Sequence, residues 1–173
     1  MNKQILATLT LTSLLMFSGC VSDEAKSSKV NPEKKMERFQ SVAMEKTTML
    51  QTGEAKHDCP ECGMKLPMFY KTNHTATSNG TVKQYCSIHC LVDDKMNNKS
   101  NLTDIKVVAV DTLKFIDVKD AIYVVGSEVK GTMSGLSKYA FEGRMSARRF
   151  AQENQGQIMT FEEAYAYAKK DFE

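Results

Sequence analysis

Tryptophan is absent from this 173-residue chain, and aromatic residues make up only 8% of it. With so few large rings to fill an interior, we expect one modest core or two small ones. An excess of charge of one sign is also absent, because 23 basic residues are balanced by 21 acidic ones. A nucleic-acid-binding protein needs a concentrated basic face, so we expect no nucleic-acid partner.

Long apolar runs are missing except near the N-terminus. The positive Lys3 precedes an apolar-biased run at 5–17, and small residues then lead to Cys20. This run is too short to span a bilayer comfortably, and the order of charge, apolar run and small residues is typical of an export signal. The sequence therefore predicts a signal peptide at 1–19.

The end of that segment, FSGC, resembles a bacterial lipobox, with Phe17 in place of the usual leucine. This predicts that Cys20 becomes lipid-modified and tethers the mature chain to the membrane through its acyl chains. The domain would then face the periplasm. Val21, which is not aspartate, favours the outer membrane by resemblance to lipoprotein sorting patterns.

Residues 20–52 are predicted to hold the lipid anchor, a polar linker and a short helix. The segment 21–30 is polar and small, as flexible spacers are. Asn31 and Pro32 fit an N-cap and first helical position, and Met36, Phe39 and Ala43 follow at helical spacing.

The remaining chain predicts an α+β fold made of two related ββαβ units, at 53–112 and 113–173. A single α+β domain without duplication is the alternative. The turn signal Asn79-Gly80 separates the first two strands, and a capping box starts the last helix at Thr160. The predicted strands are 68–77, 81–85, 105–110, 121–125, 137–141 and 157–159, and the predicted helices are 87–97, 146–155 and one from 160 onward.

Four of the five cysteines fall within 59–90, as the pairs C-x2-C and C-x3-C. Disulfides are permitted outside the cytoplasm, although bridges within each pair would close only small loops. Four thiolates at near zinc-ribbon spacing would also suit a structural Zn²⁺. Thiol redox catalysis is disfavoured, because Gly63 and Pro67 argue against a helix after the first pair. The members of the two pairs are Cys59, Cys62, Cys86 and Cys90.

A soft-metal site accounts for more of the residues. Cys62 and Met64 flank one glycine, so that an extended backbone points both sulfurs to the same side. A thiolate with a thioether favours Cu(I), whereas Zn²⁺ rarely takes methionine. Met133 lies in a second glycine-rich stretch, GTMSG.

Several stretches carry a family resemblance: CPECGM (59–64), YKTNHTA (70–76), AIYVVGSEVKGTMS (121–134) and SARRFAQENQGQIMTFEEA (146–164). They resemble the NosL family, lipoprotein accessory factors for nitrous oxide reductase. The resemblance implies two ββαβ units and Cu(I) bound by Cys62, Met64 and Met133. The family's G-P-M-G loop reads GTMS here, so Thr132 and Ser134 stand in place of proline and glycine.

The stretch YCSIHC also resembles the second cysteine pair of TRASH/YHS-type metal modules. Cys86 and Cys90 would then add thiolates to one site, form a second site or bind zinc.

We therefore expect a Cu(I) chaperone rather than an enzyme, since no nucleophile–base pair or phosphate loop is present. Its partner, implied by the resemblance, is nitrous oxide reductase or its maturation machinery. The alternative is a lipoprotein that binds structural Zn²⁺ or exchanges disulfides. His57, His74 and His89 are candidate auxiliary ligands.

Overall fold

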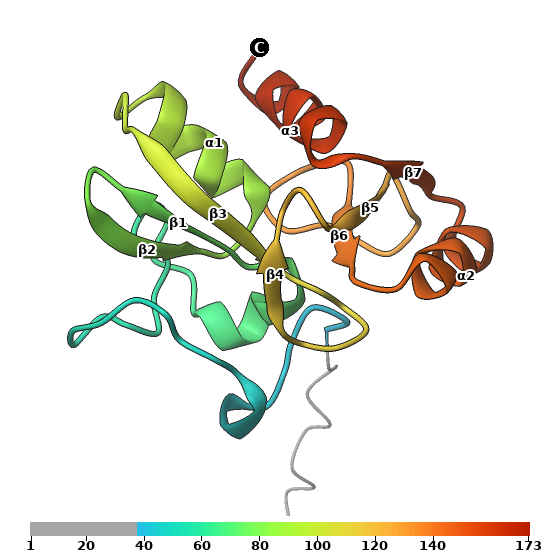
Figure 1. The fold of residues 1–173 in the computed structure, drawn as a ribbon, viewed down its shortest axis with the longest axis horizontal. Coiled ribbons are helices and arrows are strands. Elements are labelled where there is room, and N and C mark those ends of the chain that lie inside the picture. The colour runs from blue at the N-terminus through green and yellow to red at the C-terminus, as the bar shows by residue number, and fades with distance from the viewer. Residues whose placement is uncertain (1–37) are drawn as a thin grey trace, which may run out of the picture. The chain divides into compact units, whose positions relative to one another are not determined.

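The computed structural model describes residues 38–173 (Figure 1). The predicted signal peptide, Cys20 and the start of the helix predicted near 31–43 lie outside these residues. Residues 38–43 contain a turn and no helix, so that prediction is wrong there. Their backbone pairs with a distant segment instead, because Lys71 N donates to Gln40 O and Val42 N donates to Pro67 O. The first regular element is the short 3₁₀ helix η1 (Met44–Lys46).

The first sheet has four antiparallel strands in the order β2-β1-β3-β4. The left-handed conformations of Asn79 and Gly80, with φ of 47° and 84°, make the tight turn that joins β1 to β2. A helix, α1, follows β2. The bounds are β1 (His74–Ser78), β2 (Thr81–Tyr85), α1 (Ile88–Met96), β3 (Leu102–Val108) and β4 (Phe115–Asp117).

The second sheet has three antiparallel strands in the order β6-β5-β7. A helix, α2, connects β6 to β7, and α3 follows β7. Thr160 caps α3 through a complete capping box with Glu163, as predicted. The bounds are β5 (Ile122–Val125), β6 (Lys138–Phe141), α2 (Arg144–Asn154), β7 (Gln157–Met159), α3 (Phe161–Lys169) and the 3₁₀ helix η3 (Lys170–Phe172).

The two sheets repeat one topology. In each, a hairpin is followed by a helix and by a strand that returns beside the first strand of the hairpin. The predicted α+β class is confirmed, and this shared order fits the two predicted ββαβ units. The boundary between 112 and 113 stays a prediction. Strand β4, which lies beyond that boundary, pairs with β3 of the first sheet.

The strand predicted at 68–77 is wrong in its first half. Residues Leu66–Thr72 form the 3₁₀ segment η2, and the strand begins only at His74. Pro67 sits in the first turn of η2, where its missing N–H costs no hydrogen bond. Leu66 and Tyr70, at helical spacing, are both fully buried, so the segment packs by the helical period rather than by the alternation of a strand.

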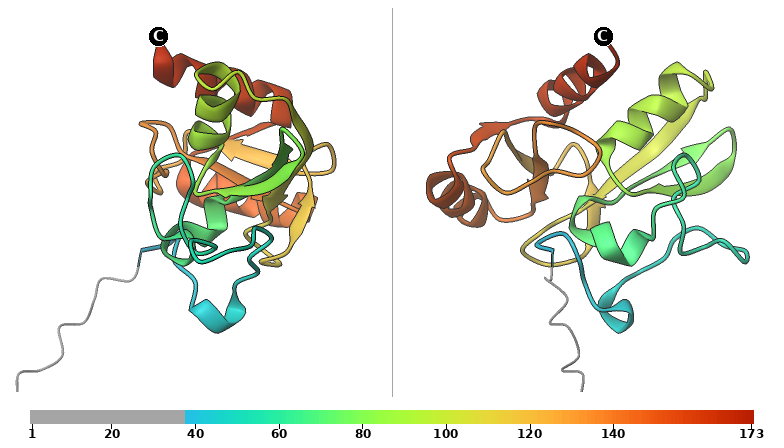
Figure 2. Two further views of the ribbon diagram at one scale, coloured as in Figure 1. Left: turned by 90° about the vertical axis from the view of Figure 1, so that its left-hand side faces the viewer. Right: turned by 180° about the vertical axis from the view of Figure 1, so that it is seen from behind.

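Backbone and side-chain hydrogen bonds join the two sheets. Val110 N donates to Ala140 O at 2.8 Å, and a bridge pairs Ala109 with Ala140. The buried His74 of β1 contacts the hydroxyl of Tyr123 on β5 at 2.9 Å. Helices α1 and α3 lie side by side beyond the sheets (Figures 1 and 2). Among residues 38–173, no helix combines the length and apolar character needed to cross a bilayer.

Candidate metal centre

Four cysteines converge although they come from two separate segments. Cys59 and Cys62 lie in the turn before η2, Cys86 follows β2, and Cys90 lies in the first turn of α1. All four sulfur atoms lie within 4.8 Å of one another. The Sγ of Cys86 is 3.5 Å from that of Cys62 and 3.6 Å from that of Cys90. The described cysteines are free thiols, so the four sulfurs are available to a metal ion.

The turn that carries the first pair is shaped by its own backbone. Gly63 N donates to Cys59 O at 2.8 Å, and Cys59 N donates to Met64 O at 2.8 Å. The φ of +72° at Gly63 is a conformation that side-chain-bearing residues rarely adopt. A bridge between Asp58 and Lys65 closes the base of the turn. This loop is not a helix N-terminus, so it lacks the support that a redox C-x-x-C takes from one.

Burial divides the four thiols. Cys59, Cys86 and Cys90 are buried, whereas Cys62 is exposed. Hydrogen bonds from the Cys86 and Cys90 thiols lower the pKa of Cys59 well below its ordinary value. The same hydrogen bonds to Cys59 raise the pKa values of Cys86 and Cys90. These hydrogen bonds favour the thiolate form of Cys59, and a metal ion would displace protons from the other thiols.

Met64 packs beside this cluster, and the loop that carries Met133 is linked to the cysteine segment. Met64 follows the cysteine turn and packs, partly buried, against the core that contains Cys59, Cys86 and Cys90. Met133 is 39% exposed and has a φ of +59°. Its loop approaches the cluster through Thr132, whose hydroxyl lies 2.8 Å from the hydroxyl of Thr72.

Thr72 links that loop directly to the cysteine segment. Its hydroxyl also lies 2.8 Å from the carbonyl oxygen of Cys86, so two hydrogen bonds connect Thr132 to the backbone of a cysteine in the cluster. Both threonines are buried. Thr132 therefore anchors the Met133 loop beside the cysteine segment. Whether Met64 and Met133 ligate a metal stays a prediction.

The side-chain carboxylate of Asp171, near the C-terminus, contacts the other side of the Met133 loop. Asp171 of η3 accepts a hydrogen bond from the Ser134 hydroxyl at 3.0 Å and pairs with Lys138 Nζ at 3.3 Å. It also lies 3.4 Å from Nδ1 of His89 on α1. We call Asp171, Ser134, Lys138 and His89 the C-terminal clasp. It joins the Met133 loop to the helix that carries Cys90.

None of the three histidines is within the cysteine group of candidate ligands. Both ring nitrogens of His74 have partners, Thr72 O and Tyr123 OH, so this residue is structural. His89 stacks on Phe172, with ring centroids 4.4 Å apart. Nδ1 of His57 is buried without a hydrogen-bond partner. The structure thus does not bring the predicted auxiliary ligands to the cluster.

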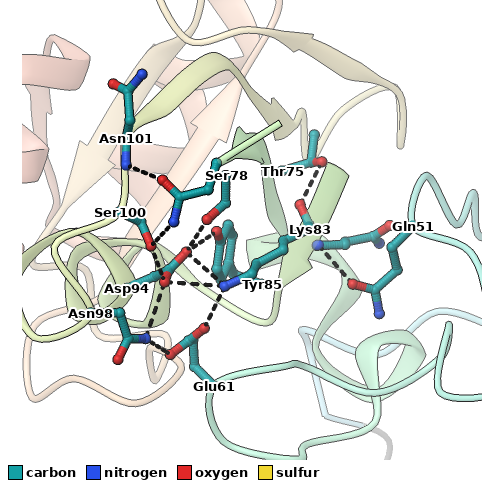
Figure 3. Close-up of polar contacts among 12 residues, drawn as sticks. Gln51, Glu61, Thr75, Ser78, Lys83, Tyr85, Asp94, Asn98, Ser100 and Asn101 are labelled. Atoms are coloured by element: carbon teal, nitrogen blue, oxygen red, sulfur yellow. Dashed lines mark hydrogen bonds and ion pairs between the residues drawn. The ribbon is translucent and has the colours of Figure 1, made fainter. Parts of the chain in front are cut away.

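A buried polar network behind the cysteines was missed by sequence reasoning (Figure 3). It centres on Asp94, which is fully buried on α1, and it reaches Glu61 between the first two cysteines through Lys83. One signal was available: Cys90 and Asp94 are four residues apart within the predicted helix 87–97, which places them on one helix face.

The fold and the cluster together define a small α+β protein with a sulfur-rich site able to hold a metal ion. The model of the NosL family matches residues 50–167, and the chain therefore belongs to the NosL family.

Two relatives illustrate the similarity. The "Copper-binding lipoprotein NosL" of Stutzerimonas stutzeri is 28% identical over 116 residues, which are 61% of this chain and 60% of that protein. This chain thus spans less than two thirds of that relative. The crystal structure of the copper chaperone NosL from Shewanella denitrificans matches with a TM-score of 0.52 at 23% identity. That match covers 65% of this chain and 92% of the other, and at this identity it establishes the fold. Neither relative is named as an enzyme.

Proposed function

We propose that this protein binds Cu(I) at the cysteine cluster and its neighbouring methionines, and passes the ion to an acceptor protein. The observation that carries the proposal is the convergence of four thiols with the Met133 loop, through the hydrogen bonds that Thr72 makes with the Thr132 hydroxyl and with Cys86 O. Thiolate and thioether sulfurs together form a donor set that selects Cu(I). The names of the two relatives, a copper-binding lipoprotein and a copper chaperone, support the same choice.

The exposure of the donors suits transfer. Cys62 is exposed and Met133 is 39% exposed, while the other three cysteines are buried. An incoming ligand from an acceptor would meet these two sulfurs first and could add to the ion before a buried thiolate leaves. The buried thiolates would meanwhile hold the ion against loss to water.

The family resemblance supports a proposal for the acceptor, and the N-terminal sequence supports one for the location. We propose nitrous oxide reductase, or its maturation machinery, as the destination of the copper. A lipid on Cys20 would tether the domain at the periplasmic face of the membrane, with the outer membrane favoured.

Structural Zn²⁺ binding is the second candidate, and two sulfur–sulfur separations favour it. Zn–S bonds of 2.3 Å in a tetrahedron separate the sulfurs by about 3.8 Å. The 3.5 Å and 3.6 Å separations at Cys86 are close to that value. Such a site would use four cysteines and neither methionine.

Methionine replacement separates these two candidates. Met64→Leu and Met133→Leu keep side-chain bulk and remove the sulfur, so we expect weaker Cu(I) binding and unchanged Zn²⁺ binding. Met145→Leu is the matched control, since Met145 is 74% exposed and belongs to α2. Affinities are measured anaerobically on the reduced protein by competition with chromophoric chelators. An equal response of both metals to these replacements, or no response of either, would refute the Cu(I) proposal.

A further inference from the structure

Glu61 lies between Cys59 and Cys62 in the sequence, and its carboxylate is held at both oxygens. Oε1 is 3.4 Å from Nζ of Lys83, and Oε2 accepts a hydrogen bond from the Asn98 side chain at 2.8 Å. The Glu61 side chain is only 10% exposed. Burial, followed by repulsion from Asp94, raises its pKa. A carboxylate inside the cysteine turn is therefore drawn toward the body of the protein.

Asp94 is the anchor of this arrangement (Figure 3). It lies one helical turn after Cys90 and is fully buried. Its carboxylate is 3.1 Å from Nζ of Lys83 and accepts from Asn98 Nδ2 at 3.1 Å. Burial alone would raise the pKa of Asp94, but hydrogen bonds outweigh it and hold the pKa below its ordinary value. The hydroxyl donors at 2.7–2.8 Å are Tyr85, Ser100 and Ser78.

Lys83 and Asn98 each contact both carboxylates, so they bridge the two segments that supply the cysteines. Glu61 belongs to the turn with the first pair, and Asp94 to the helix with Cys90. A second bridge supports the first, because Gln51 bonds to Asp58 O on one side and accepts from Gln84 N of β2 on the other. The two segments that carry the cysteines are thus held together by polar contacts that do not involve the cysteines themselves.

We propose that Glu61 and Lys83 are positioning residues of the metal site. The pair, anchored on Asp94, fixes the cysteine turn against α1, so that the four sulfurs stand within binding distance before the ion arrives. The proposal rests on metal binding by the cluster, as put forward above. Without this preorganisation, an ion would have to draw the two segments together at the expense of its binding energy.

The pair can be broken without emptying the network. Glu61→Gln keeps the size of the side chain and an oxygen for Asn98, but it removes the charge that Lys83 contacts. Lys83→Met keeps the length of the side chain and removes its charge. In both variants Asp94 retains its three hydroxyl donors. The matched control is Lys119→Met, whose lysine lies 3.9 Å from Asp117 in an exposed pair.

Removing a group that orients metal ligands typically weakens metal binding 10- to 100-fold. Lys83 is 29% exposed, so water can take over part of its role. We therefore expect each variant to raise the dissociation constant about 10-fold, the lower end of that range. The double variant should lose about as much as either single one, since both remove one contact. Lys83→Arg keeps the positive charge and should therefore retain most of the wild-type affinity.

The experiment uses the full chain, reduced and metal-free, with Cu(I) and Zn²⁺ affinities from chelator competition under anaerobic conditions. The charge-transfer spectrum of the Co²⁺-loaded protein reports the geometry of the sulfur ligands. If Glu61 and Lys83 only stabilised the fold, this spectrum would be unchanged in the variants. We expect the charge-transfer bands to weaken in Glu61→Gln and Lys83→Met. Thermal melts of the metal-free variants establish that they are folded.

Two results would overturn the proposal: folded Glu61→Gln and Lys83→Met with dissociation constants within twofold of wild type, or an equal loss in Lys119→Met. The copper proposal fails separately. If wild type binds Zn²⁺ tightly and Cu(I) weakly, Cu(I) transfer is refuted, and the ratios of Zn²⁺ affinity among the variants still test the positioning role.

Discussion

His74 joins the two sheets, and its burial predicts a loss of stability in mild acid. The ring is fully buried, with Nδ1 3.0 Å from Thr72 O and Nε2 2.9 Å from the hydroxyl of Tyr123. Because a carbonyl can only accept, Nδ1 carries the hydrogen and the neutral Nε2 accepts from Tyr123. Protonation would place a charge away from water and leave two donors facing each other.

The magnitude follows from the change in pKa. Burial lowers the pKa of His74 from 6.5 to about 4, against the opposing effect of its bond to Thr72. Each tenfold change in proton affinity is worth about 1.4 kcal/mol, so the whole effect is about 3 kcal/mol. The pKa is depressed on folding. The stabilisation is therefore complete above about pH 6.5 and is lost as the pH falls toward about 4.

Urea unfolding of the reduced, metal-free protein at pH 7 and pH 4.5 measures this loss. We expect wild type to lose about 2 kcal/mol more than His74→Gln, which has no titrating ring. The raised pKa of Glu61 acts in the opposite direction, but it is common to both proteins and cancels in the difference. Equal pH dependence in the two proteins would refute the reasoning. An NMR titration that finds the His74 ring protonating near pH 6.5 would refute it independently.

Two further predictions concern the Met133 loop. A Cβ on Gly131 would lie 2.9 Å from the backbone Cα of Ser137, so Gly131→Ala should lower the free energy of unfolding in urea by about 1–3 kcal/mol. The control Gly135→Ala has open space around the new Cβ and should lower it by less than about 0.5 kcal/mol. Equal effects would contradict this packing argument. Asp171→Asn removes the charge facing Lys138 in the C-terminal clasp, so the Met133 loop should open more readily. Cu(I) release to a chelator, followed by stopped-flow absorbance, should then accelerate about threefold, where a tenfold change corresponds to about 1.4 kcal/mol. An unchanged rate would show that the clasp does not restrain the loop.

Local signals in the sequence predicted much of the fold. The Asn79-Gly80 turn, the strand 81–85 and the capped start of α3 at Thr160 depend on neighbouring residues, and all three are confirmed. The strand predicted over 68–72 is wrong, because aromatic and β-branched residues there favour a strand while tertiary contacts bury Leu66 and Tyr70 at helical spacing. Strand β4 has only three residues, too few for a periodic signal.

The sequence predicts which residue types gather at the candidate site, but not the polar contacts that hold them in place. The density of cysteines in 59–90 identified the segment as chemically special. The contacts around Glu61 depend on Lys83 and Asn98, which are far from it in sequence, so no local pattern could reveal them. The buried hydroxyls of Thr72 and Thr132 are equally invisible, since threonines at such positions are ordinarily read as strand or loop residues.

The repeated topology has a consequence for how such a site can change between relatives. All four thiols and their polar support at Glu61, Lys83 and Asp94 belong to the first predicted unit, 53–112, while Met133 belongs to the second, 113–173. The two units share one strand order and one buried core, and they are also joined by the Thr72–Thr132 hydrogen bond and the C-terminal clasp. Evolution can therefore add or remove the thiol cluster by substitutions within one half, leaving the thioether loop of the other half untouched.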